Sequence, residues 1–229
     1  MKTSPGARSW IAAGVRHELL SRVLPALRHD MAAPVSVIRM GLLLLRRQVS
    51  EPEIDAQACG ERVALIDDQI GEMIKGVRSL RDWELATADS GISRPALVAQ
   101  CAGLLHAAFD TLGVALEIDP ALQREDDVQL WPRAAALRYM LLAALSFLHD
   151  SATERGAVLI EPDGERGLAL RWQARPADEA AGLRDGVAHR APRKLAIDAI
   201  ALQSLADDLG YEVTLERAEL VRLPLAASG

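Results

Sequence analysis

The sequence has few of the residues that several kinds of functional site require. Its 229 residues include two cysteines, Cys59 and Cys101, which are far apart and show no Cys-x-x-Cys spacing. This excludes a disulfide framework, and both are expected to be buried free thiols. Aromatic residues make up 3% of the chain, no block of Lys or Arg occurs, and the net charge is −6. Nucleic acid is therefore not an expected partner, because such a surface needs a basic stripe or stacking rings.

Several other signals are also missing. No run of eighteen uncharged apolar residues occurs, and no apolar stretch with a cleavage site follows Met1, so we expect a cytoplasmic protein that is not in a membrane. The histidines form no pair at i, i+3 or i+4, which argues against a metal site of this chain's own. Gly-x-Ser-x-Gly and Walker motifs are absent as well.

The most informative segment that is present is Leu27–Val35, which contains His29, Asp30 and Pro34. Apolar residues around it recur in the alternating steps of four and three that are typical of a helix-bundle seam. These residues are Leu20, Leu24, Leu27, Met31, Pro34, Ile38 and Leu45. At about 100° per residue, His29 falls opposite this seam, which predicts an exposed imidazole rather than a buried core histidine.

Pro34 lies inside this helical pattern. Proline in a helix costs about 3 kcal/mol and leaves a carbonyl one turn upstream without its donor. The alternative is a helix break near residue 33. The seam spacing continues to Leu45, however, and predicts one helix from about Ser9 to Val49.

A second long helix is expected to begin at Ser50-Glu51-Pro52, with Ser50 as N-cap and Pro52 in the first turn. Its apolar stripe consists of Cys59, Val63, Ile66, Ile70, Met73, Val77 and Leu80. Two antiparallel helices of about 35 to 40 residues would not bury both stripes alone, so a homodimeric four-helix bundle is predicted. The alternative is that the stripes pack on the C-terminal half of the same chain.

The helical pattern stops near residues 88–91, where we place a domain boundary. Beyond it, helices alternate with strands, which predicts a mixed sheet with helices on one face. The expected helices cover residues 94–112, 132–150 and 193–209, the last closed by Gly210. The expected strands cover Val114–Ile118, a hairpin turned at Pro162-Asp163-Gly164, and residues 211–217 and 219–225, with a loop over about 174–191.

This pattern resembles the two-component histidine kinases. His29-Asp30-x-x-x-Pro34 resembles their H-box, Leu137–Phe147 their N-box helix, and Leu195–Gly210 with Val221–Leu225 their last helix and strands. The resemblance implies an α+β fold: a long antiparallel helical hairpin that forms a dimeric four-helix bundle, then a degenerate histidine-kinase ATPase-like α/β sandwich domain. Residues 1–90 would be the dimerisation and phosphotransfer hairpin, and residues 91–229 the degenerate ATP-binding-like domain.

The nucleotide site of that family is degenerate in this sequence. Ala143 and Phe147 stand where the family has its two N-box asparagines, so the oxygen ligand for Mg²⁺ is replaced by hydrocarbon. The glycine-rich motifs that let a backbone approach adenine and phosphates are also missing. Four residues of the expected loop are interpreted as solvated rather than nucleotide-binding: Asp178, Gly182, Asp185 and Gly186.

Degenerate kinases of this kind include the ChpT-like histidine phosphotransferases, which the chain also resembles in Ser21-Arg22 and in Pro34-Val35. The resemblance implies that His29 carries a phosphoryl group between receiver-domain aspartates without ATP. Asp30 would orient its imidazole, although it could also be a plain helix-surface acid. Response-regulator receivers, and a hybrid histidine kinase, would be the partners, and the receiver would supply Mg²⁺.

Two further readings stay open. The chain could be an ATP-dependent histidine kinase with a divergent nucleotide site, or a docking-only pseudokinase that is never phosphorylated. In phosphatase-competent members of the family, a Thr or Asn four residues after the histidine orients water. This sequence has Ala33 there, which makes dephosphorylation of a receiver by water doubtful.

Overall fold

The computed structural model describes residues 5–85, 90–111, 113–124, 127–175 and 195–227. The chain forms two compact units: Leu24–Thr87, and the described residues of Met1–Val23 together with those of Ala88–Gly229. Among the described residues, no helix combines the length and the apolar character needed to cross a lipid bilayer. The expected loop residues Asp178, Gly182, Asp185 and Gly186 lie outside the described residues.

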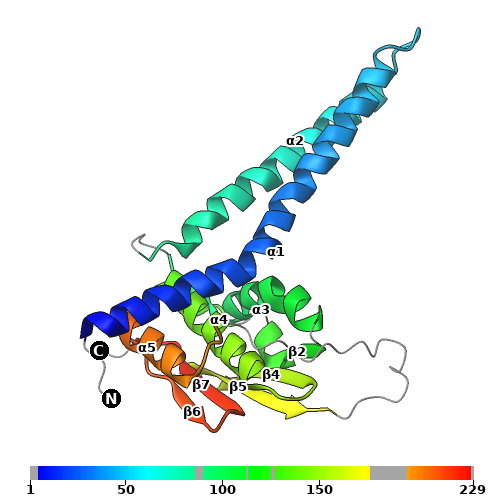
Figure 1. The fold of residues 1–229 in the computed structure, drawn as a ribbon. Helices are drawn as coiled ribbons and strands as arrows, with labels where there is room; N and C mark the ends of the chain where they lie inside the picture. Colours follow the sequence, from blue (N-terminus) through cyan, green and yellow to red (C-terminus); the bar gives the residue numbers. More distant parts are fainter. Residues whose placement is uncertain (1–4, 86–89, 112, 125–126, 176–194, 228–229) are drawn as a thin grey trace. The chain divides into compact units, whose positions relative to one another are not determined.

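Helix α1 (Pro5–Gln48) is one helix of 44 residues with Pro25 and Pro34 inside it. The predicted continuation through Pro34 is therefore confirmed, and the alternative break near residue 33 is wrong. Helix α2 (Ala56–Ser79) has 24 residues and continues into the short 3-10 helix η1 (Leu80–Trp83). Figure 1 shows the two helices running as an antiparallel hairpin.

The start of α2 was predicted wrongly. Its N-cap is Asp55, whose carboxylate accepts from the backbone N–H groups of Gln57 and Ala58. Ser50 does not cap it, because its hydroxyl donates to the carbonyl of Arg46 at 2.8 Å. Residues 49–53 form turns and bends instead of a first helical turn. The helix begins later than expected and already ends at Ser79, so it is also shorter than the 35 to 40 residues predicted.

Small residues set the register of the hairpin. A Cβ on Gly41 would lie 3.0 Å from Ile66 Cγ1, and a Cβ on Gly76 would lie 3.4 Å from Met31 Cγ. The absence of a side chain at each glycine lets the opposite helix approach closely. Met31 of α1 thus lies beside Gly76 near the end of α2, and Gly41 lies beside Ile66 in the middle of α2.

Much of the apolar surface of this hairpin is exposed. No residue of α2 is buried, and four members of its predicted stripe are exposed: Val63, Ile70, Val77 and Leu80. Leu42 and Leu43 of α1 are also exposed. The two helices of one chain therefore leave both stripes incompletely covered.

The second unit contains a five-stranded sheet in the order β2-β4-β5-β7-β6, in which only the β2–β4 pair is parallel. Helices α3, α4 and α5 lie on one face of this sheet (Figure 1), as predicted. The strands are β2 (Val114–Ile118), β4 (Gly156–Asp163), β5 (Gly167–Ala174), β6 (Thr214–Glu216) and β7 (Leu220–Pro224). The helices are α3 (Arg94–Thr111), α4 (Ala134–Ser151) and α5 (Ala199–Leu209).

Three boundaries differ from the sequence pattern. Pro162 and Asp163, expected in a turn, belong to β4 and pair with Leu168 and Gly167. Strand β6 has three residues, Thr214–Glu216, within the expected 211–217. Helix α5 begins at Ala199, where Asp198 caps it by accepting from Ala201 N–H, rather than near residue 193. Gly210 closes it in the left-handed conformation at φ 71°, as expected. The sequence pattern missed the two-residue strands β1 (Ile92–Ser93) and β3 (Leu130–Trp131), which pair with each other, and the short 3-10 helix η2 (Pro120–Gln123).

The first part of α1 packs within the α/β unit. Its buried residues are Ala12, Val15, Leu19 and Val23, at helical spacing. Leu20 and Leu24 of the predicted seam are not the buried residues there, so the face predicted for this part of the helix is wrong by one position. The buried face of α1 is decided by which helices it meets, and the sequence pattern alone does not show that.

Candidate functional site

His29 lies on α1 with its side chain 83% exposed. The helix places this residue away from Pro34 and Gly41, which are the buried positions of α1 within the hairpin unit. The predicted exposure of His29 is therefore confirmed. An imidazole held on a regular helix and open to solvent is free to meet a partner protein.

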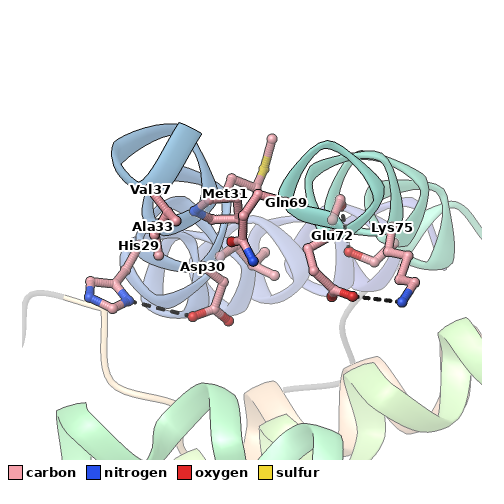
Figure 2. A pocket seen from close by; sticks show the side chains of 12 residues that line it. His29, Asp30, Met31, Ala33, Val37, Gln69, Glu72 and Lys75 are labelled. Carbon is pink, nitrogen blue, oxygen red and sulfur yellow. Dashed lines mark hydrogen bonds and ion pairs between the residues drawn. The ribbon is translucent and has the colours of Figure 1, made fainter. Parts of the chain in front are cut away.

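Asp30, the next residue, has its carboxylate beside this ring. Its Oδ1 lies 3.5 Å from His29 Nδ1, and the Asp30 side chain is 74% exposed. The dashed line in Figure 2 joins these two groups. A carboxylate next to one ring nitrogen favours the tautomer with the proton on that nitrogen, which leaves a lone pair on the other.

A hollow of about 530 Å³ lies beside these residues, between α1 and α2. Its α1 side includes the apolar residues Leu27, Met31, Pro34 and Val37, and its α2 side is polar (Figure 2). The complete lining consists of Leu27, His29, Asp30, Met31, Ala33, Pro34, Val37, Gln69, Glu72, Lys75, Gly76 and Ser79. The hollow thus has a mainly apolar side on α1 and a mainly polar side on α2.

On the α2 side, Lys75 Nζ donates to Glu72 Oε1 at 2.7 Å. This hydrogen bond, together with the Glu72 charge, raises the pKa of Lys75 above its ordinary value. Ser79 donates its hydroxyl to the carbonyl of Gly76 at 2.7 Å, so its side chain is engaged within its own helix. Lys75 and Glu72 thus form one ion pair at the rim of the hollow.

Pro34 is buried within the hairpin and also lines the hollow. Because proline has no N–H, the carbonyl of Asp30 one turn earlier lacks its usual helical donor. Ala33 lines the same hollow and has no polar side-chain atom that could orient water. Pro34 therefore acts on the shape of the site rather than on its charge.

The positions that resemble the N-box lie on α4. Ala143 and Phe147 are both buried among the apolar residues of the α/β core. Neither presents an oxygen or nitrogen atom of a side chain. In the part of the chain that the structure describes, no three His, Cys, Asp or Glu side chains gather closely enough to hold a metal ion.

Both cysteines are free, but only Cys101 is buried, whereas Cys59 is half-buried. Burial raises the pKa of the Cys101 thiol to about 12, although the Arg138 charge lowers it. This thiol is therefore unreactive at neutral pH. The expectation of burial is confirmed for Cys101 and wrong for Cys59.

Four polar residues of the hollow were not predicted from the sequence: Gln69, Glu72, Lys75 and Ser79. Their placement depends on which residues of α2 lie opposite His29, and this depends on where α2 begins. With α2 predicted to begin after Ser50, the residues of α2 that lie opposite His29 could not be identified.

No protein-family model matches the chain, and no curated protein matches it in sequence. Similar solved structures include histidine kinase ThkA in complex with response regulator protein TrrA, at 12% identity and a TM-score of 0.37, covering 98% of this chain and 68% of that chain. Another is the Erythrobacter litoralis EL346 blue-light activated histidine kinase, at 13% identity and a TM-score of 0.38, covering 87% of this chain and 60% of that chain.

A third is the Acinetobacter baumannii histidine kinase AdeS, at 12% identity and a TM-score of 0.32, covering 86% of this chain and 98% of that chain. The chain thus spans less than two thirds of the Erythrobacter kinase. Because all three TM-scores lie below 0.5, the chemistry of this chain is inferred from its own residues.

Proposed function

We propose that this protein is a histidine phosphotransferase of a two-component phosphorelay, which moves a phosphoryl group between receiver-domain aspartates through His29. The observation that carries the proposal is the exposed His29 imidazole with the Asp30 carboxylate 3.5 Å from its Nδ1. The pair lies on a helical hairpin, beside a hollow that is open to a partner. Asp30 lies on the helix surface, and its carboxylate orients the His29 imidazole.

The transfer is a substitution at phosphorus. The lone pair of His29 Nε2 attacks the phosphorus of a receiver's aspartyl phosphate, a P–N bond forms, and the P–O bond to the aspartate breaks. The aspartate leaves as a carboxylate. The proton stays on Nδ1, so the phosphorylated ring is cationic and the Asp30 carboxylate balances part of its charge. The reverse step passes the group to the aspartate of another receiver.

The partner is a response-regulator receiver, and a hybrid histidine kinase carrying such a receiver is a further candidate. Phosphoryl transfer needs in-line geometry and a divalent cation. In this proposal the receiver supplies both Mg²⁺ and the acidic residues that hold it. His29 supplies the nucleophile, and the apolar α1 side of the hollow supplies the docking surface.

The hairpins of two copies of the chain together form a four-helix bundle. The exposed stripe on α2 and the exposed leucines of α1 support a homodimer with a four-helix bundle, because a stable pair of long helices buries such a surface. Ala143 and Phe147 are buried and have hydrocarbon side chains, which supports transfer without ATP. These positions offer no side-chain oxygen to Mg²⁺.

The test is phosphorylation of the purified protein. It is incubated with radiolabelled ATP alone, and then with a receiver that a histidine kinase has charged from the same ATP. The proposal predicts label only with the charged receiver. The label should be lost in acid and retained in base, as a phosphoramidate is, and absent from His29→Ala. The matched control is His17→Ala, because His17 is another exposed histidine of α1.

Each other outcome assigns a different function. Label from ATP alone, lost in His29→Ala, would identify a histidine kinase with a divergent nucleotide site. Receiver binding without label, across the receivers of the source genome, would identify a docking-only pseudokinase. Label retained in His29→Ala would place the phosphoryl group on another residue.

A further inference from the structure

We draw no further inference here: the strongest candidate, the apolar surface patch that Leu195 and Ile200 expose at the start of α5 in the α/β unit, carries nothing because no contact among the described residues shows what covers it.

Discussion

The Arg22 guanidinium and the Asp150 carboxylate form a buried ion pair in which Nη2 lies 2.8 Å from Oδ2 and the two side chains are 7% and 4% exposed. Asp150 also accepts from the backbone N–H of Ile197 at 2.9 Å, and His149 Nδ1 lies 2.9 Å from its other oxygen. One carboxylate thus joins α1, α4 and the segment before α5. Its partners satisfy both of its oxygens, which a buried charge requires.

Removing this carboxylate should destabilise the protein strongly. Asp150→Ala leaves the buried Arg22 with only Glu18 and the carbonyl of Leu195, and loss of one partner of a buried pair costs about 3 kcal/mol or more in the free energy of unfolding. Urea denaturation followed by circular dichroism measures the change. The control is Glu72→Ala, which breaks the exposed pair with Lys75 and should have no measurable effect. Equal effects of the two substitutions would contradict the role of burial.

The same pair makes stability depend on pH. Burial alone would raise the pKa of Asp150, but hydrogen bonds from His149, Arg22 and the Ile197 N–H, with the Arg22 charge, lower it from 3.8 to about 2. Because the folded-state pKa is below the unfolded-state value, this stabilisation is complete above about pH 4 and is lost as pH falls towards about 2.

Urea denaturation of the parent protein and of Asp150→Asn at a series of pH values tests this. The difference between their free energies of unfolding should be constant near neutral pH and should shrink between about pH 4 and about pH 2. A difference that does not change over this range would show that the carboxylate is not specifically stabilised.

The two glycines of the hairpin should respond differently to alanine. Gly76→Ala meets only an ordinary contact with Met31 and should stabilise the hairpin by up to about 1 kcal/mol through helix propensity. Gly41→Ala places Cβ 3.0 Å from Ile66 Cγ1, and this crowding should offset the gain or exceed it. Urea midpoints at one fixed protein concentration compare them. Equal stabilisation at both sites would mean that the helices are not in close contact at Gly41.

A charge within the exposed apolar stripe should prevent dimerisation. Val63→Glu or Val77→Glu should convert a dimer into a monomer, because the charge would be buried in the four-helix bundle without a partner. Sedimentation equilibrium measures the mass. Val128→Glu is the control, since Val128 is an exposed apolar residue of the α/β unit. A parent protein that sediments as a monomer would contradict the proposed homodimer.

Asp30 should affect the rate of transfer rather than its occurrence. Asp30→Asn keeps a similar shape but loses the charge that orients and balances the His29 ring, so transfer from a charged receiver should slow about tenfold to a hundredfold. Quench-flow measurement of labelled protein gives the rate. Asp30→Glu should recover part of it. If Asp30→Asn transfers at the parent rate, Asp30 is only a surface acid.

Local periodicity was sufficient for the features that depend on neighbouring residues. The spacing of apolar residues predicted a continuous α1 with His29 exposed, because a helix assigns each position to a face without reference to the rest of the chain. It also predicted β2 at Val114–Ile118, the closure of α5 by Gly210, and the mixed sheet with helices on one face. Strong local preferences agreed with the fold at each of these places.

Other features were decided only by contacts between distant residues. Ser50 and Asp55 are both residue types that cap helices well, and the sequence does not say which of them begins α2. The residues of α2 that lie opposite His29 therefore could not be predicted. Strands β1 and β3 have two residues each, too few for a period, and exist because they pair with each other. Val23 and the residues before it belong to the α/β unit, where Arg22 pairs with Asp150, 128 residues away, and no local pattern contains such a contact.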